Sequence, residues 1–213
     1  MPSSDLGSLL AGATVVPVLM IDAVETALPL ARALVGGGIA VLEITLRTPA
    51  ALEAIRAIAG EVEDAVVGAG TVLTPAQYQA AERAGARFVV SPGGTPALLE
   101  AAAASSVPFL PGAATASEVM RLLEHGYRCL KFFPAEPAGG IACLQALAAP
   151  LPEARFCPTG GIDAERAPGY LALPNVLCVG GSWLAPRDAV VAGDWPRITE
   201  LARAAAALRG SVK

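Results

Sequence analysis

Lys131 is the residue whose type and sequence surroundings most clearly indicate chemistry. The only other lysine of the chain is Lys213, and arginine supplies the rest of the side-chain positive charge. Lys131 lies in the apolar stretch 129–134, and burial in such surroundings disfavours the charged form of an amine. A neutral lysine is a nucleophile that forms a Schiff base with a carbonyl. The alternative is a structural lysine that pairs with a core carboxylate or extends from a strand end into solvent.

Glu43 is the carboxylate that would complement such a lysine. Residues 42–47 are typical of a strand, in which alternate side chains point to opposite faces, so Glu43, Thr45 and Arg47 share one face. The other face is apolar, and we expect it to pack against helices. A carboxylate beside an attacking amine can move protons to and from the oxygen and carbon atoms of a substrate. The alternative is a structural ion pair of Glu43 with Arg47 or Lys131.

Glycine pairs after the last two predicted strands indicate a phosphate site. Thr159, Gly160 and Gly161 follow one of these strands, and Gly181 and Ser182 follow the other. In α/β barrels the loops after strands seven and eight often bind phosphate through backbone N–H groups. Thr159 and Ser182 would add hydroxyl donors. The alternative is a pair of ordinary tight turns.

Predicted strands and helices alternate along the chain and would bring these residues together. The strand candidates are β-prone apolar runs at residues 15–21, 39–46, 65–69, 88–91, 109–111, 129–132, 155–158 and 176–179. The helical candidates are Ala- and Leu-rich runs at residues 24–35, 49–59, 75–84, 96–104, 117–124, 140–149, 163–171 and 195–208.

This alternation predicts an α/β fold with a parallel sheet, closed into a (β/α)8 TIM barrel, with an additional N-terminal helix at residues 3–11. An open doubly wound sheet is the alternative. In a barrel the active site lies at the carboxyl ends of the strands, where the polar residues of this chain gather. With no linker or low-complexity tract, we expect one domain, residues 1–213.

The composition excludes other classes of function. The formal net charge is −4, the pI is near 5.1 and no basic run is present, so nucleic-acid binding has no electrostatic support. The longest uncharged stretch, residues 167–186, is interrupted by proline and glycine, so we expect no membrane-spanning helix. We also expect no signal peptide. Scattered cysteines indicate a reduced, cytoplasmic protein, and a single histidine cannot build a His-rich zinc site. Schiff-base chemistry would need no metal, so we expect no cofactor.

Five motifs spread over most of the chain resemble those of the 2-keto-3-deoxy-6-phosphogluconate (KDPG) and 4-hydroxy-2-oxoglutarate aldolases. These are class I, Schiff-base enzymes, and KDPG aldolase belongs to the Entner–Doudoroff pathway. The motifs are VLEITLRT at residues 41–48, VGAGTVL at 67–73, LKFFPAE at 130–136, FCPTGGI at 156–162 and GGSWL at 180–184. The resemblance implies a (β/α)8 barrel with an extra N-terminal helix that forms homotrimers. The chain departs from the commoner family pattern at Gly94 and in residues 111–115.

The resemblance also implies a role for individual residues. Lys131 matches the Schiff-base lysine of the family, and Glu43 matches its general acid and base. Three further residues match those that hold the pyruvate carboxylate, namely Arg47, Thr71 and Thr159. Four match residues of the phosphate-binding loops, namely Gly160, Gly161, Gly181 and Ser182. Two match the apolar walls beside the lysine, namely Pro92 and Phe133.

The implied reaction is cleavage of KDPG to pyruvate and D-glyceraldehyde 3-phosphate. It involves small-molecule substrates, with no nucleic-acid or membrane partner. Within the same chemistry, 4-hydroxy-2-oxoglutarate or 2-keto-3-deoxy-6-phosphogalactonate is the alternative substrate, because all three contain the pyruvate half. Two other classes remain open, namely a phosphate-binding barrel isomerase or epimerase and a non-catalytic binding protein. The lysine in its motif favours the aldolase.

Overall fold

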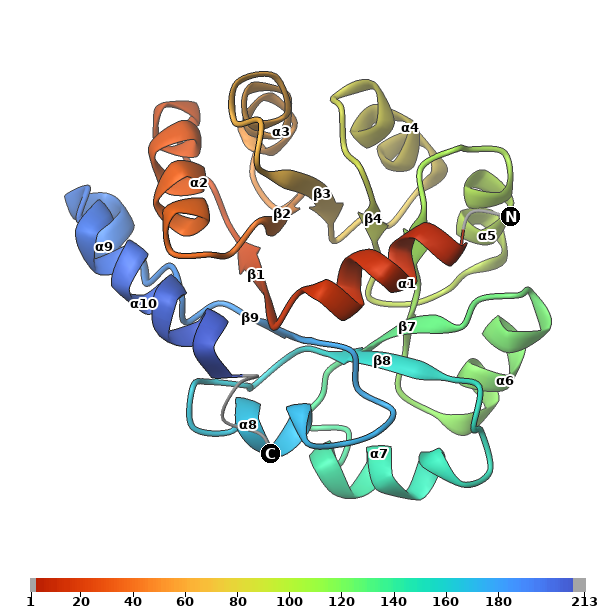
Figure 1. Cartoon of the computed structure of the whole chain (residues 1–213). Coiled ribbons are helices and arrows are strands. Elements are labelled where there is room, and N and C mark those ends of the chain that lie inside the picture. Colours follow the sequence, from red (N-terminus) through yellow and green to blue (C-terminus); the bar gives the residue numbers. More distant parts are fainter. Residues whose placement is uncertain (1–2, 209–213) are drawn as a thin grey trace.

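The structure, a computed structural model, describes residues 3–208 and shows strands around a central axis with helices outside them (Figure 1). Lys213 lies outside the described residues. The strands are β1 (Val15–Leu19), β2 (Val41–Thr45), β3 (Val66–Gly70), β4 (Val89–Val90), β5 (Phe109–Leu110), β6 (Gly112–Ala113), β7 (Cys129–Phe132), β8 (Arg155–Pro158) and β9 (Val179–Gly181). The helices are α1 (Ser3–Gly12), α2 (Ala27–Gly36), α3 (Ala51–Glu61), α4 (Pro75–Arg83), α5 (Pro96–Ala103), α6 (Ala116–Glu124), α7 (Gly140–Ala148), α8 (Ala167–Leu171), α9 (Arg187–Ala192) and α10 (Trp195–Ala207), with a 3-10 turn at Val24–Thr26.

Hydrogen bonds between strands close the barrel. One parallel sheet has the order β5-β4-β3-β2-β1-β9, and the other has the order β6-β7-β8. β5 and β6 are two halves of one extended segment interrupted at Pro111, so this segment joins the two sheets. On the other side, bridges Phe156–Val176 and Thr159–Gly180 connect β8 with the segment that contains β9. The predicted (β/α)8 barrel with an N-terminal helix is confirmed, and the open sheet is excluded.

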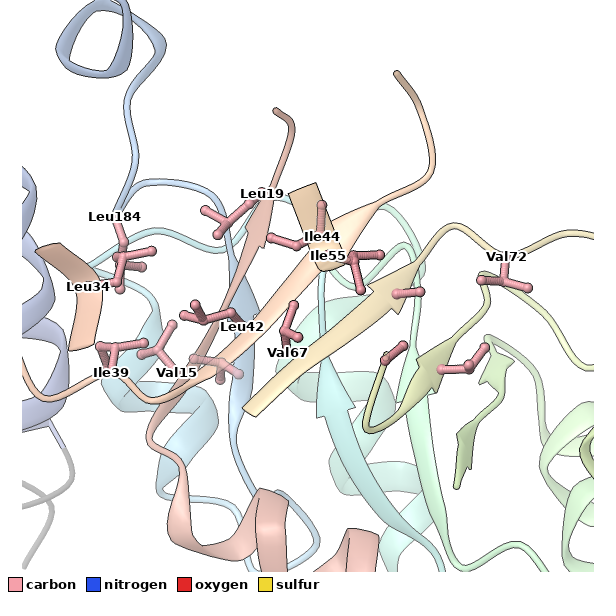
Figure 2. Packing of buried hydrophobic residues seen from close by; sticks show 14 of the residues in the cluster. Val15, Leu19, Leu34, Ile39, Leu42, Ile44, Ile55, Val67, Val72 and Leu184 are labelled. Carbon is pink, nitrogen blue, oxygen red and sulfur yellow. The ribbon is translucent and has the colours of Figure 1, made fainter. Parts of the chain in front are cut away.

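Alternation along the strands divides the apolar side chains between two cores. Leu42 and Ile44 of β2 point outward into a large cluster with Ile55 of α3, between the sheet and the helices (Figure 2). A smaller cluster fills the barrel interior and contains Leu6 and Leu10 of α1, which are 2% and 1% exposed. Burial of each such leucine stabilises the fold by roughly 1.5–3 kcal/mol. α1 therefore covers the end of the barrel at which the strands begin.

Helix boundaries follow local capping signals. Thr74 and Thr95 precede a proline at the first turns of α4 and α5, and each hydroxyl accepts a backbone N–H three residues later. The sequence did not predict α9, which is short and begins after Pro186 and ends at Gly193, where φ is 66°. β9 begins at Val179, so it lies later than the predicted run. Within residues 3–208 no helix is both long and apolar enough to span a bilayer.

The start of α6 contains a capping box, which makes it a test of local stability. Thr115 accepts the N–H of Glu118, and the Glu118 carboxylate accepts the N–H groups of Ala114 and Thr115. We expect Thr115→Ala to lower the free energy of unfolding by about 1 kcal/mol, measured by urea denaturation. An unchanged unfolding midpoint would contradict this.

The same capping box has a pH dependence. The backbone N–H of Ala114 lowers the pKa of Glu118, with further hydrogen bonds from Thr115. A carboxylate whose pKa is lower in the folded state stabilises the fold above its unfolded pKa, and this contribution is lost as the pH falls through the folded value. The destabilisation caused by Thr115→Ala should therefore shrink in acid.

Candidate active site

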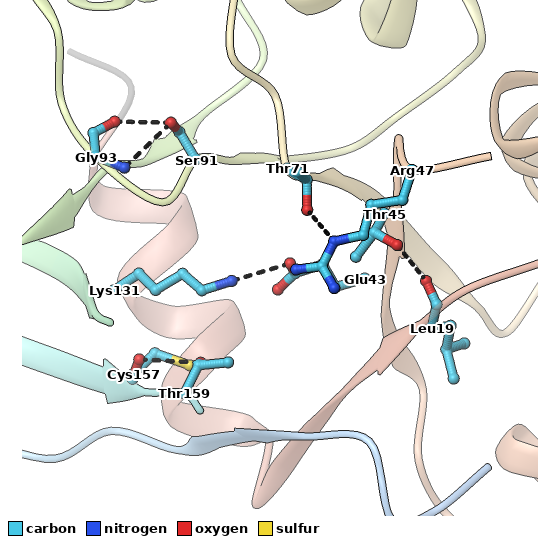
Figure 3. A network of polar contacts seen from close by, with 10 residues as sticks. All are labelled: Leu19, Glu43, Thr45, Arg47, Thr71, Ser91, Gly93, Lys131, Cys157 and Thr159. Atoms are coloured by element: carbon cyan, nitrogen blue, oxygen red, sulfur yellow. Dashed lines mark hydrogen bonds and ion pairs between the residues drawn. The ribbon is translucent and has the colours of Figure 1, made fainter. Parts of the chain in front are cut away.

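The site contains a buried ion pair between strands that lie far apart in the sequence. Lys131 of β7 and Glu43 of β2 both point into the barrel, and Nζ lies 3.1 Å from Oε1 (Figure 3). Their side chains are only 7% and 4% exposed. Desolvation makes a buried ion pair weak evidence for stability, so the pair is a candidate for chemistry. The inward orientation expected from strand alternation is confirmed for both residues.

Apolar groups and backbone surround the lysine. Phe133 lies with its ring centroid 5.5 Å from Nζ of Lys131. Gly112 is the register partner of Lys131 in the neighbouring strand, and a Cβ at Gly112 would lie 2.1 Å from the carbonyl oxygen of Pro92. Pro92 therefore packs against the strand next to the lysine. Of the two predicted walls, Phe133 lies beside the amine, and Pro92 lies against the neighbouring strand.

Arg47 and Thr71 extend from the ends of β2 and β3. Nε of Arg47 donates a hydrogen bond of 3.2 Å to Oγ1 of Thr71 (Figure 3). Thr71 has a φ of 57°, which is uncommon for a β-branched residue and is typical of strained positions at functional sites. Thr45, on the same face of β2 as Glu43, donates 2.9 Å to the carbonyl of Leu19 and fastens β2 to β1. The exposed guanidinium of Arg47 is thus held at the mouth of the barrel.

A cavity of about 310 Å³ opens at this end of the barrel. It brings together residues from the ends of strands β1, β2, β7, β8 and β9. The predicted site residues in its wall are Arg47, Phe133, Thr159, Gly160, Gly161, Gly181 and Ser182. Lys131, Glu43, Thr71 and Pro92 are not in this wall, but Phe133 contacts both the cavity and the lysine. The structure therefore places two of the three carboxylate-site candidates, Arg47 and Thr159, and all four phosphate-site candidates around one space.

The cavity also has lining residues that the sequence did not indicate. Val18, Leu19 and Met20 from the end of β1 form one side. Their apolar side chains carry no chemical signature, so only the strand order reveals them. Gly180 also lies in the wall, although the sequence did indicate it, and a Cβ there would lie 2.1 Å from Oγ1 of Thr159. The signal for Gly180 was its place in the second glycine pair.

Gly70 fixes the position of the catalytic candidate Glu43. A Cβ at Gly70 would lie 2.1 Å from Oε1 and 2.6 Å from Cγ of Glu43. We expect Gly70→Ala to displace the carboxylate from Lys131 and to lower kcat for aldol cleavage about 10²-fold, because small misplacements of reacting groups have effects of this order. The matched control is Gly60→Ala in α3, where an added Cβ has no neighbour within 4 Å. Wild-type kcat in folded Gly70→Ala would contradict the steric argument.

A lysine nucleophile and a carboxylate that face each other inside a (β/α)8 barrel are the equipment of class I aldolases. A comparison with protein families agrees with this class. The model of the family described as KDPG and KHG aldolase matches residues 6–201 of this chain. The chain belongs to the KDPG and KHG aldolase family, and it is a carbon–carbon lyase.

Relatives and solved structures support this assignment over nearly the whole chain. The KHG/KDPG aldolase of Escherichia coli (strain K12) is 54% identical over 198 residues, 93% of each chain. The 2-dehydro-3-deoxy-phosphogluconate aldolase of Zymomonas mobilis is 49% identical over 205 residues, 96% of this chain and 97% of its own. The structure of KDPG aldolase from Legionella pneumophila, with pyruvate captured as a covalent carbinolamine intermediate, has a TM-score of 0.92 at 49% identity and covers 94% of this chain and 97% of its own.

A second solved structure carries a phosphorylated ligand. KDPG aldolase of Zymomonas mobilis ZM4 with 3-phosphoglycerate has a TM-score of 0.92 at 48% identity, and it covers 98% of this chain and 99% of its own. The predicted family and enzyme class are confirmed. A barrel isomerase, left open by the sequence, is excluded as the class of this enzyme.

Proposed function

We propose that this aldolase cleaves KDPG to pyruvate and D-glyceraldehyde 3-phosphate through a Schiff base on Lys131. The observation that carries the proposal is the buried pair of Lys131 and Glu43, 3.1 Å apart, at the carboxyl ends of the strands. The pair is suited to this reaction because Glu43 can accept the proton that the amine must lose before it attacks. The covalent pyruvate adduct of the Legionella pneumophila relative is consistent with the same chemistry.

The reaction follows from the positions of these two groups. Glu43 takes a proton from the ammonium of Lys131, and the neutral amine attacks the C2 ketone of KDPG. The resulting carbinolamine takes this proton back from Glu43 as it loses water, which gives a protonated imine and leaves Glu43 ionised. Glu43 removes the proton of the C4 hydroxyl, the C3–C4 bond breaks, and its electron pair moves onto C3 to give an enamine while the iminium is neutralised. The aldehyde leaves. Protonation of C3 and hydrolysis of the imine then release pyruvate and restore the amine.

The cavity residues bind the two ends of the substrate. Arg47, Thr71 and Thr159 hold the pyruvate carboxylate, with Arg47 oriented by its hydrogen bond to Thr71. The phosphate lies against backbone N–H groups of the two glycine loops, formed by Gly160, Gly161, Gly181 and Ser182. Pro92 and Phe133 are the apolar walls beside Lys131, and the Phe133 ring centroid lies 5.5 Å from its amine. The Zymomonas mobilis relative with 3-phosphoglycerate supports a phosphorylated ligand.

The enzyme acts as a single-domain subunit of a homotrimer in the cytoplasm, as the family resemblance implies. The measurement that checks its assembly is the molar mass in solution by analytical ultracentrifugation. A stable monomer with full activity would remove the trimer from the proposal.

The decisive experiment is incubation with pyruvate and sodium borohydride, followed by intact-mass measurement and peptide mapping. Lys131, Lys213 and the N-terminus are the amines of the chain, so the modified position is easily assigned. A stable adduct on Lys131 is the expected result. Folded protein that gives no adduct would overturn the Schiff-base mechanism.

A second substrate is favoured by the double name of the Escherichia coli relative, KHG/KDPG aldolase. The pyruvate half is common to both substrates, so the lysine and carboxylate serve either one. The glycine loops distinguish them, because only KDPG carries a phosphate. We expect kcat/KM to be higher for KDPG than for 4-hydroxy-2-oxoglutarate, and the reverse order would identify the latter as the main substrate.

A further inference from the structure

Glu136 is a carboxylate of the lysine motif to which the aldol chemistry gives no role. It lies five positions after Lys131, in the loop between β7 and α7. The hydroxyl of Tyr170 donates a hydrogen bond to Oε1 of Glu136, and Nε of Arg166 lies 3.5 Å from Oε2. The Glu136 side chain is 37% exposed, whereas Tyr170 is fully buried. The carboxylate is therefore tied to the segment that follows β8.

The backbone beside Glu136 binds the glycine loop directly. The N–H of Ala135 donates 2.8 Å to the carbonyl of Thr159, and the N–H of Glu136 donates 3.0 Å to the carbonyl of Gly160. These bonds continue the pairing of β7 and β8 beyond the ends of both strands.

The glycines of the loop also pack against Glu136. Gly161 has a φ of 80°, and a Cβ there would lie 2.8 Å from both Cβ and Cγ of Glu136. Gly160 has a φ of 109°, and its Cβ would lie 3.3 Å from the backbone nitrogen of Ala135. Both glycines adopt a conformation that side chains disfavour, and both lie in the wall of the 310 Å³ cavity. The position of the loop thus depends on the segment that carries Glu136.

Tyr170 anchors the far end of the same loop. It lies on α8, the helix at the end of the loop. The pKa of its hydroxyl is raised, mainly because the residue is buried and also because the hydroxyl donates a hydrogen bond to Glu136. The tyrosine therefore remains a neutral donor. Arg166 is shared between Glu136 and Asp163, so it offsets part of the charge of Glu136, and the carboxylate opposes an anion in the cavity less than a free one would.

We propose that Glu136 is a positioning residue. It holds both ends of the loop that contains Gly160 and Gly161, so that the loop has the conformation that binds the substrate phosphate. This rests on the proposed function, in which that loop holds the phosphate. Glu136 touches neither the reacting atoms nor Lys131. Its effect therefore appears in phosphate recognition and not in imine formation.

The test compares Glu136→Ala, Glu136→Gln and Tyr170→Phe in the full chain. The matched control is Glu165→Gln, an exposed carboxylate in the same loop. The measurements are kcat and KM for KDPG, kcat/KM for unphosphorylated 2-keto-3-deoxygluconate, inhibition by inorganic phosphate, and borohydride trapping of pyruvate.

Glu136→Ala should raise both the KM for KDPG and the inhibition constant of phosphate about 10-fold, as expected for loss of a hydrogen bond to a charged group. Its kcat should stay within about 2-fold, and pyruvate trapping and unphosphorylated-sugar cleavage should not change. Glu136→Gln should retain most of the wild-type affinity, because its amide oxygen still accepts from Tyr170. Tyr170→Phe should weaken phosphate binding in the same direction as Glu136→Ala.

Unchanged phosphate inhibition in Glu136→Ala would overturn the proposal, as would an equal loss of activity on the unphosphorylated sugar. If Glu136→Ala fails to fold, Tyr170→Phe decides by the same criteria. Failure of the proposed function is seen separately in the wild-type enzyme, which would then form no pyruvate adduct or would not be inhibited by phosphate.

Discussion

Replacement of Lys131 by arginine should abolish aldol cleavage, with a loss of more than ~10⁴-fold, because removal of a nucleophile has effects at least this large in other covalent enzymes. A guanidinium does not deprotonate in proteins, so it cannot attack the ketone of KDPG. Borohydride trapping of pyruvate should disappear together with turnover. The measurement is a coupled assay for pyruvate release, with intact-mass measurement of the trapped enzyme.

The control for this replacement must separate chemistry from stability. Loss of one partner from a buried ion pair leaves the other charge unpaired and destabilises a protein by roughly 3–5 kcal/mol. Lys131→Met combined with Glu43→Gln removes both charges, so it should fold better than Lys131→Met alone and still lack activity. Turnover well above background in folded Lys131→Arg would rule out a Schiff base at this position.

Replacement of Glu43 by glutamine should slow turnover by roughly 10²–10⁴-fold, the usual contribution of a general acid–base group. The amide preserves the shape of the side chain at 3% residue exposure, but it cannot take the proton of the C4 hydroxyl. Lys131 is still present, so borohydride should still trap pyruvate, although more slowly. Glu43→Gln should therefore still form the pyruvate adduct, whereas Lys131→Arg should form none, so the two variants differ in more than the rate of turnover.

Glu63→Gln, which changes an exposed carboxylate, is the control for the Glu43 variant and should behave as wild type. If Glu43→Gln cleaved KDPG at the wild-type rate, Glu43 would be only the structural partner of Lys131. In that case another group would have to transfer the proton.

The barrel could be predicted because local and global signals agree in this chain. Leu42, Glu43 and Ile44 alternate between apolar and polar, and the structure buries the two apolar residues under helices while Glu43 faces the axis. The proximity of Glu43 and Lys131 could be predicted because alternation points both side chains inward and both strands belong to one barrel. The carboxyl-end rule then located the cavity.

The rest of the fold depends on contacts that have no period in the sequence. The strand predicted at residues 109–111 is β5, which ends at Leu110. After Pro111 the chain continues as β6, which the sequence did not predict and which pairs with a different neighbour. The six-residue helix α9 is too short for a periodic pattern, although Pro186 and Gly193 bracket it.

Two contacts in the site could not be predicted from the sequence for a similar reason. The constraint on Gly70 comes from the side chain of Glu43 on the adjacent strand. The contact of Glu136 with Tyr170 joins the loop after β7 to helix α8, and the two residues are 34 positions apart in the chain. Pairwise contacts of this kind are set by tertiary packing, so a single sequence does not reveal them.

The helix α1 also determines how molecules enter and leave the barrel. Leu6 and Leu10 fill the barrel interior at the end opposite the cavity. In the described part of the chain, substrate and products therefore pass through the same opening, at the cavity. In the proposed mechanism pyruvate stays covalently bound to Lys131 while the aldehyde leaves through this opening, so the aldehyde is released first. In the synthetic direction of the same mechanism, pyruvate must bind before the aldehyde.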